Sequence, residues 1–454
     1  MAILKEKEDI IKYFTELYEQ HGKALTRQSA DVVNERRVEA REFFSRFGLP
    51  GKKDEKYKYT YLEPHLKNGY NTLFEPEKIT FDSDDLFRCD VPELDTHVII
   101  LLNGFYYERF NKQATPKGIT VGSFQQMAAQ YPDIYKKHYG KIADIHTDGL
   151  VSLNTMLAQD GIFIHVPKNS VNDKPIQIIN LLLADKELLV QHRNLFVLEP
   201  GSKAEVIICD HTLSPHKYMT NSVSEVYVDE NAHLDITRVQ NEHNGAVQLS
   251  NLFIKQEAGS NVKTQTFTLH GGVVRNNAYV QLNGEGAHND TNGFFITDQR
   301  QHVDSFTLVE HNVPNCTSNQ LFKGVLDDMS TGAFNGKIYV AQDAQKTSAF
   351  QRNNNILLTD TAKMHSKPQL EIYADDVKCS HGATMGQLDE QAMFYLQSRG
   401  INKKESRLLL MFAFAHEIIK EIKSEPLRRR IDELIDKRLR GELTRCNNCA
   451  MHCG

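Results

Sequence analysis

Two residues in the C-terminal third of the chain have types and a spacing suited to metal binding. Cys379 and His381 are separated by one residue within the stretch 374–389. Residues i and i+2 of an extended segment point to the same side, so both side chains can face one metal ion, one sulfur carrier or one partner surface. A thiolate and a neutral imidazole are both good ligands for iron or zinc. The alternative is that Cys379 is a small buried apolar residue and His381 opens a helix, because two ligands alone do not make a metal site.

The last residues form a second cluster of metal-ligand types. Cys446, Cys449, His452 and Cys453 bring three thiols and one imidazole into eight residues. That set is sufficient for a tetrahedral zinc ion or an iron–sulfur centre. The alternative is a disordered terminus whose thiols are incidental. We expect reversible binding of zinc or iron at this tail and no permanently bound cofactor.

A region of short strands precedes Cys379. From about residue 160 to 377, long helical periodicity disappears and turn residues recur before alternating segments, at positions 201, 231, 259 and 286, which lie 27 to 30 residues apart. After residue 300 the recurrences come about twice as often, near His302, Cys316, Gly332, Lys346 and Ala362, as expected if each coil has two faces. A fixed period of turn and strand is typical of a solenoid. The prediction is a right-handed parallel β-helix, with a β-sandwich as the alternative.

Helical patterns at both ends of the chain complete a mainly β fold with α ends. We predict a mostly helical domain over 1–150, the β-helix core over 151–380, a helical domain over 381–441 and the cysteine-rich tail over 442–454. Within the first domain, Asn103-Gly104 is a strong hairpin signal between two β-rich segments. A solenoid cannot leave its apolar interior open to water, so we expect the helical ends to cap the stack.

Composition excludes several classes of function. The 454-residue chain has a net charge of −6, so general affinity for nucleic acid is not indicated. No apolar run approaches the length of roughly 18 residues that a membrane span needs. The N-terminus becomes charged within five residues and lacks a secretory signal, and the seven cysteines form no disulfide framework. We expect a cytoplasmic protein that contacts neither membrane nor nucleic acid.

The run from Cys379 to Gly400, CSHGATMGQLDEQAMFYLQSRG, resembles the signature of the SufB/SufD family of iron–sulfur cluster assembly scaffolds. Further segments match in order: His311-x-x-Pro314-x-Cys316-x-Ser318-x-Gln320-x-Phe322-Lys323-Gly324, Phe334-x-Gly336-Lys337-Ile338, Ala344-Gln345-Lys346-Thr347 and Pro368-x-Leu370-Glu371-Ile372-x-Ala374-Asp375-Asp376. The segment from Phe47 to Thr60 is similar to the SufD branch in particular. The resemblance covers nearly the whole chain, and is weakest over about 65–150 and in the last ten residues.

The resemblance implies a function and a site. In this family SufD pairs with SufB, both bind the ATPase SufC, and the assembly site lies where SufB and SufD meet. There a SufB cysteine works with a SufD histidine, which His381 matches, and Cys379 matches a neighbouring family cysteine. These two residues are therefore our candidates for the assembly chemistry and for ligating iron or a transient iron–sulfur cluster. The resemblance also implies that the C-terminal helices bind the ATPase, and that a homodimer forms when SufB is absent.

The sequence leaves other functions open. Gly332-x-x-x-Gly336-Lys337 is one residue shorter than a phosphate loop and is followed by Ile338 instead of Ser or Thr, so we expect ATP hydrolysis to come from a partner. The main hypothesis is a scaffold that is not an enzyme by itself. The alternatives are a β-helix carbohydrate-active enzyme and a purely structural homo-oligomer. The missing secretion signal argues against the carbohydrate enzyme.

Overall fold

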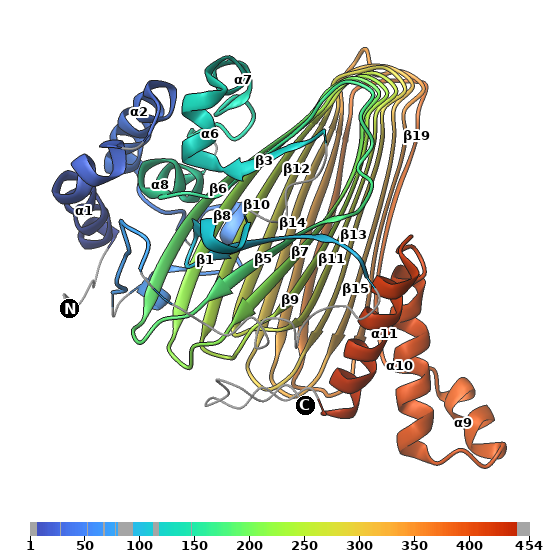
Figure 1. The fold of residues 1–454 in the computed structure, drawn as a ribbon. Coiled ribbons are helices and arrows are strands. Elements are labelled where there is room, and N and C mark those ends of the chain that lie inside the picture. The colour runs from blue at the N-terminus through green and yellow to red at the C-terminus, as the bar shows by residue number, and fades with distance from the viewer. Residues whose placement is uncertain are drawn as a thin grey trace.

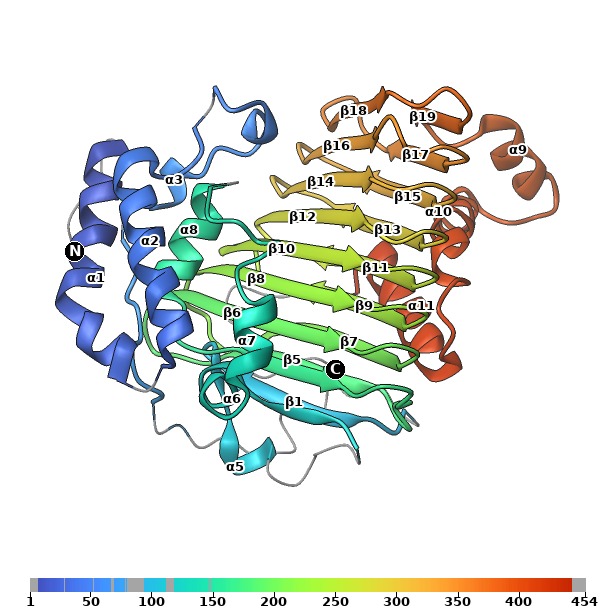
Figure 2. The same ribbon diagram turned by 90° about the horizontal axis from the view of Figure 1, so that it is seen from above.

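A computed structural model shows a parallel β-solenoid built from two sheets, with helices along its sides (Figures 1 and 2). It describes residues 7–442 except 28, 52, 67–68, 78, 80–93, 112–117 and 147. Sheet A consists of β3 (Thr120–Ser123), β4 (Ile162–Val166), β6 (Leu188–Leu198), β8 (Tyr218–Val228), β10 (Ala246–Gln256), β12 (Val273–Leu282), β14 (His302–His311), β16 (Thr331–Val340) and β18 (Lys363–Ile372). Sheet B consists of β1 (His97–Leu102), β2 (Phe105–Tyr106), β5 (Ile176–Leu182), β7 (Lys203–Thr212), β9 (His233–Asn241), β11 (Asn261–His270), β13 (His288–Thr297), β15 (Thr317–Leu326), β17 (Ser348–Leu357) and β19 (Lys378–Gly386).

The turns before the sheet B strands explain the sequence period. Gly201, Asn231, Gly259 and Gly286 have φ angles of 70°, 55°, 64° and 74°, the left-handed region that favours Gly and Asn. The turns also stack, since a Cβ on Gly259 would lie 2.5 Å from Asn231 Oδ1. After residue 300, β14, β15, β16, β17 and β18 begin within two residues of the predicted recurrences. The solenoid prediction is confirmed, and the β-sandwich alternative is wrong.

The N-terminal end of the solenoid is closed by strands. β1 and β2 form the predicted hairpin around Asn103-Gly104, and β3 pairs antiparallel with β4. Ile99, Leu101 and Val121 from these strands are buried in one apolar cluster with the interior of the first coils. Strands that precede residue 150 therefore belong to both sheets. The division of the chain at 150, 380 and 441 stays a prediction.

Helices of the N-terminal region cover the outer face of the early sheet A strands (Figure 2). They are α1 (Lys7–Arg27), α2 (Asp31–Phe47), α3 (Glu63–Leu66), α6 (Phe124–Gln130), α7 (Pro132–His138) and α8 (Gly149–Leu157), with a 3₁₀ turn at Glu55–Tyr57. The short helix α5 (Glu108–Asn111) packs instead against β1 of sheet B. A fully buried ion pair joins helices to sheet: Arg193 Nη2 lies 2.6 Å from Glu225 Oε1. Arg193 also donates to Thr155 of α8, and Glu225 accepts the backbone N–H of Gly140 after α7. This end is thus fixed by both apolar packing and buried charge.

The C-terminal helices are α9 (Glu390–Ser398), α10 (Lys403–Ile419) and α11 (Glu425–Arg440), and they do not cap the solenoid. They lie beside sheet B, where Leu408 and Ile418 of α10 pack in one cluster with Phe267 and Phe294 (Figure 2). The prediction that this helical end closes the stack is wrong. The helices pack along sheet B instead because the outer face of β11 and β13 carries large apolar side chains. Without the helices, these side chains would be exposed to water.

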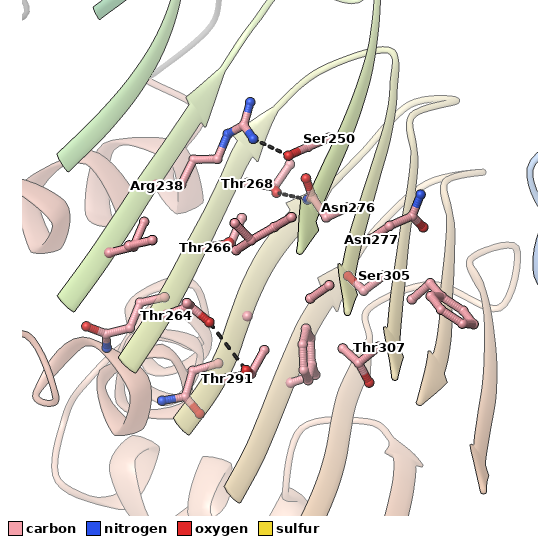
Figure 3. A pocket seen from close by; sticks show the side chains of 18 of the residues that line it. Arg238, Ser250, Thr264, Thr266, Thr268, Asn276, Asn277, Thr291, Ser305 and Thr307 are labelled. Carbon is pink, nitrogen blue, oxygen red and sulfur yellow. Dashed lines mark hydrogen bonds between the residues drawn. The ribbon is translucent and has the colours of Figure 1, made fainter. Parts of the chain in front are cut away.

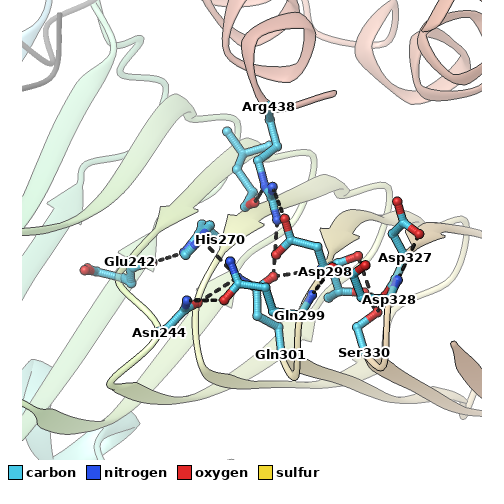
Figure 4. A network of polar contacts seen from close by, with 12 residues as sticks. Glu242, Asn244, His270, Asp298, Gln299, Gln301, Asp327, Asp328, Ser330 and Arg438 are labelled. Carbon is cyan, nitrogen blue, oxygen red and sulfur yellow. Dashed lines mark hydrogen bonds and ion pairs between the residues drawn. The ribbon is translucent and has the colours of Figure 1, made fainter. Parts of the chain in front are cut away.

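Buried cations anchor these helices to the solenoid. Arg438 of α11 is 5% exposed and donates to Leu269 O at 2.7 Å, to Asp298 Oδ2 at 2.7 Å and to Gln301 Oε1 at 3.2 Å (Figure 4). Lys323 of β15 donates to the backbone carbonyl of Phe414 in α10 at 2.9 Å. The hydrogen bonds of Arg438 and Lys323 therefore determine where α11 and α10 pack on the solenoid.

The interior of the solenoid contains polar side chains among its apolar core. A cavity of about 60 Å³ between the sheets is lined by Thr, Ser and Asn side chains, by Arg238 and by apolar side chains such as Ile236 and Phe295 (Figure 3). Arg238 Nε donates to Asp210 Oδ2 at 2.7 Å, and its Nη1 donates to Ser250. Further along the axis, Thr307 Oγ1 donates to Gln320 Oε1 at 2.6 Å. This polar row continues toward the last coil, where the predicted site residues lie.

Candidate functional site

The two predicted site residues lie on the last strand of the solenoid. β19 pairs with β17 on one side only, with Ala349 opposite Cys379 and Gln351 opposite His381. Ala349 and Gln351 are buried, at 0% and 1% exposure, so this face of the strands points into the coil. Cys379 and His381 therefore share the interior-facing side of β19, as their spacing predicts, above the end of the polar row.

The Cys379 thiol is half-buried in an apolar setting. It packs against a cluster that contains Ile338, Val340 and Ala374. Burial raises the pKa of this thiol, and a hydrogen bond involving the Ala349 backbone opposes the rise. A thiol is a nucleophile and metal ligand only as its thiolate, so this environment keeps Cys379 protonated until a cation or another charge reaches it.

The His381 side chain is exposed, although its register partner Gln351 on β17 is buried. Among the described residues, none is hydrogen bonded to the His381 ring. Gln351 beneath it donates through Nε2 to Gln320 Oε1 at 3.2 Å, and its own Oε1 is buried without a partner in the described part of the chain. A free imidazole at the end of a polar interior can ligate a metal ion through either ring nitrogen.

The end of the solenoid is open around these residues. Within the described ranges, β18 and β19 each have a hydrogen-bonded neighbour on one side only. Large apolar side chains at this end are exposed, including Met385 at 52% and Tyr373 at 60%. The described residues contain no group of three or more Asp, Glu, His or Cys side chains that could hold a metal ion. Cys379 and His381 supply two ligands, so a four-coordinate site here needs others from outside these residues.

The other strand of the last coil is held by a segment in which the sequence indicated no chemistry. Tyr59 stacks on His365 of β18 with ring centroids 4.3 Å apart, and Glu55 forms an ion pair with Lys367 of the same strand. This segment, residues 53–60, crosses the outer face of sheet A from the N-terminal helices. The signals that the sequence offered here were the alternating Tyr and Lys residues and the similarity of this segment to the SufD branch.

The remaining predicted candidates lie elsewhere. Cys446, Cys449, His452 and Cys453 are outside the described residues, so the tail stays a prediction. Cys316 is fully buried in the solenoid core. The segment from Gly332 to Lys337 lies within strand β16 and is not a phosphate-binding loop.

Family models match nearly the whole chain. Residues 181–414 match the model described as SUF system FeS cluster assembly, SufBD core domain, and residues 8–178 match the SufBD protein N-terminal region. The chain, a β-solenoid with an open last coil, therefore belongs to the SufBD family of iron–sulfur cluster assembly proteins.

Individual relatives agree with this assignment. The chain is 30% identical to the iron–sulfur cluster assembly protein SufD of Escherichia coli over 444 residues, which covers 97% of this chain and 99% of that protein. It is 30% identical to a SufBD family protein of Synechocystis over 90% of this chain and 91% of the relative. It is 24% identical to SufD of Bacillus subtilis over 73% of this chain and 76% of that protein. The chain is thus SufD-like. None of the helices formed by the described residues combines the length and the apolar character that a membrane crossing needs.

Proposed function

We propose that this chain is a scaffold subunit that pairs with a SufB-like subunit and binds a SufC-like ATPase. Iron and sulfide, the substrates of the assembly, meet at the interface of the two scaffold chains. His381 ligates iron or the nascent cluster there, and Cys379 assists as a thiolate once a cation lowers its pKa. The chain supplies ligands and a surface and carries out no reaction by itself.

The observation that carries the proposal is the open last coil. Cys379 and His381 lie on its interior face, on β19, and among the described residues the outer edges of β18 and β19 are unpaired. A free strand edge is a template for pairing with another chain, and solenoids usually cover such an end. A partner that adds strands to β18 and β19 would enclose both residues and bring the missing ligands.

The C-terminal helices provide a separate surface for the ATPase. α9 has no buried residue, and it exposes Phe394 at 73% and Tyr395 at 58%. Leu409 of α10 is 47% exposed. Exposed aromatic and apolar side chains on one helical unit are typical of a protein interface. The family resemblance supports a SufC-like ATPase as the protein that binds here.

A homodimer is the second candidate, because the same open edges can pair with those of another copy. Purification of the tagged chain from its own host distinguishes the two. Recovery of a second SufBD-type chain and an ATPase, together with iron and sulfide, supports the scaffold complex. Recovery of two copies of this chain alone supports the homodimer. The carbohydrate-active alternative has no support, since the relatives named above are all iron–sulfur cluster assembly proteins.

The substitution that tests the site is His381→Ala, made in the full chain within its complex. We expect an assembled complex whose cluster formation falls by about 10-fold or more, since a ligand is lost. The measurement is iron and sulfide incorporated per complex. His365→Ala is the matched control, because His365 belongs to the same coil but faces outward, against Tyr59. Normal cluster formation in His381→Ala would refute the site.

We also propose that the tail binds zinc or iron reversibly through Cys446, Cys449, His452 and Cys453. The support is the donor set itself, three thiols and one imidazole in eight residues. The test compares the metal content of the full chain with that of a chain ending at Thr444. We expect the full chain to hold more metal, and equal contents would contradict the proposal.

A further inference from the structure

On the neighbouring strand of sheet B, the residue opposite His381 on the interior face is Gln351. The two residues are register partners on the parallel strands β19 and β17. Strands of a sheet lie about 4.8 Å apart, so side chains that leave the same face at register partners are within contact reach. Gln351 is 1% exposed, whereas His381 is exposed. The imidazole therefore lies between solvent and a buried amide.

The amide of Gln351 is hydrogen bonded to a residue of the preceding coil. Its Nε2 donates to Gln320 Oε1 at 3.2 Å, and the same oxygen accepts Thr307 Oγ1 at 2.6 Å. The bond to Gln320 engages the NH₂ group of Gln351, and the Gln351 Oε1 atom is buried without a partner in the described part of the chain. Leaving a buried acceptor without a donor is unfavourable, so this oxygen is expected to gain a partner in the working state.

The coil also makes room for this amide. A Cβ at Gly336 of β16 would lie 2.4 Å from Gln351 Nε2, closer than any side chain can approach. Glycine at this strand position thus lets the amide lie flat across the coil interior.

We propose that Gln351 is a positioning residue for His381: its Oε1 accepts the N–H of one ring nitrogen and leaves the other nitrogen to ligate. The proposal rests on the proposed role of His381 and names the residue that selects its tautomer. A histidine that binds a metal ion commonly donates its second N–H to a carbonyl or carboxylate, which orients the ring and increases its basicity. A neutral imidazole has one donor and one acceptor nitrogen, so an acceptor below the ring decides which one faces the cluster.

The other side-chain amides on the interior face of β17, those of Asn353 and Asn355, are not placed to accept the N–H of His381. Asn353 Oδ1 already accepts hydrogen bonds from Ser366 at 2.7 Å and from Asn355 at 2.9 Å. Asn355 Oδ1 is also buried without a partner in the described chain, but its register partner is Met385, whose side chain has no N–H to donate. Asn355 is therefore a matched control for the general loss of a buried amide in this row.

The test uses the full chain in its complex and measures the initial rate of cluster formation from ferrous iron and sulfide, as a function of pH. Gln351→Met removes the acceptor at similar size and is expected to lower the rate by about 10-fold. Gln351→Glu keeps an acceptor and adds charge, which raises the pKa of an adjacent imidazole. It should therefore retain activity and move the pH midpoint upward. Asn355→Leu should leave the rate and the midpoint unchanged.

Each result separates this inference from the proposed function. If His381→Ala abolishes cluster formation but Gln351→Met behaves like Asn355→Leu, the positioning role is overturned and the proposed function stands. An unshifted midpoint in Gln351→Glu also overturns it, because a purely structural role moves no pH profile. If His381→Ala itself forms clusters normally, the proposed function fails and this inference fails with it. Thermal unfolding of each complex shows whether a variant is folded.

Discussion

The two ends of the solenoid are built in opposite ways. At the N-terminal end, β1, β2 and β3 close the coil, and Ile99 and Leu101 are 0% and 1% exposed. At the C-terminal end, β18 and β19 have free edges within the described chain, and Met385 is 52% exposed. The helices that follow β19 pack along sheet B and leave this end open.

The difference indicates which end is for stability and which is for association. Apolar burial at the closed end is worth about 25 cal/mol per Å² removed from water, so this end stabilises the isolated chain. At the open end, apolar side chains stay exposed and do not contribute this stabilisation. Its free strand edges can also cause aggregation unless a specific partner covers them. Polar side chains run through the interior toward this end, where His381 lies on the last strand, and our proposal assigns the chemistry and the partner to this end.

The largest effect is expected from a substitution near the closed end. Glu225→Ala leaves the Arg193 guanidinium buried without its carboxylate, and it removes the acceptor of the Gly140 N–H. Breaking a fully buried ion pair costs about 3–5 kcal/mol of unfolding free energy. The measurement is urea unfolding followed by circular dichroism.

A glutamate near the open end is the control for this prediction. Glu371 of β18 pairs with Lys337 at 2.6 Å, and its side chain is 43% exposed. Glu371→Ala should cost no more than about 1 kcal/mol, because exposed ion pairs contribute little. Equal losses in Glu225→Ala and Glu371→Ala would break the contrast between the two ends.

A smaller effect is expected on acidification, at a residue enclosed in the solenoid. His311 is 0% exposed, its Nε2 is hydrogen bonded to Ser318 Oγ at 2.8 Å, and burial lowers its pKa to about 4. The fold favours the neutral ring, so its contribution is complete above about pH 6.5 and is lost as the pH falls toward 4. At pH 5 the loss is about 2 kcal/mol.

The variant His311→Gln checks this assignment, because its amide takes up no proton. The measurement is the unfolding free energy of both proteins from pH 7 to pH 5. The difference between pH 7 and pH 5 should be smaller in the variant by about 2 kcal/mol. Identical pH dependence in the two proteins would show that His311 is not the group that must charge.

Much of the fold was predictable because its signals are local. The positive φ angles at Gly201, Asn231 and Gly259 require residues that the sequence displays at a constant period. The position of α10 and α11 was not predictable in the same way. An apolar helix face shows that the helix is covered and does not show by what. The large outward-facing side chains Phe267 and Phe294 were the available signal, since a solvent-facing strand position is usually polar.

The candidate site was predictable only in part. The alternation of a strand places Cys379 and His381 on one face, and the structure shows them there. Gln351 could be found only from the register between coils, which depends on the length of every turn in between. Gln320, Gln351 and His381 recur at about the coil period, and this is the signal that a repeat alignment would have used.

The smallest effect on stability is expected at His381 itself. Its ring is exposed, and no described residue is hydrogen bonded to it, so His381→Ala should change the unfolding free energy of the isolated chain by less than about 0.5 kcal/mol. Ile99→Ala at the closed end should cost about 2–5 kcal/mol, because it leaves a cavity. Urea unfolding of the two variants without any partner makes the comparison. A loss of about 2 kcal/mol or more in His381→Ala would mean that the ring is packed in the isolated chain. The last coil would then be closed by this chain's own residues, and a partner would have no open end to complete.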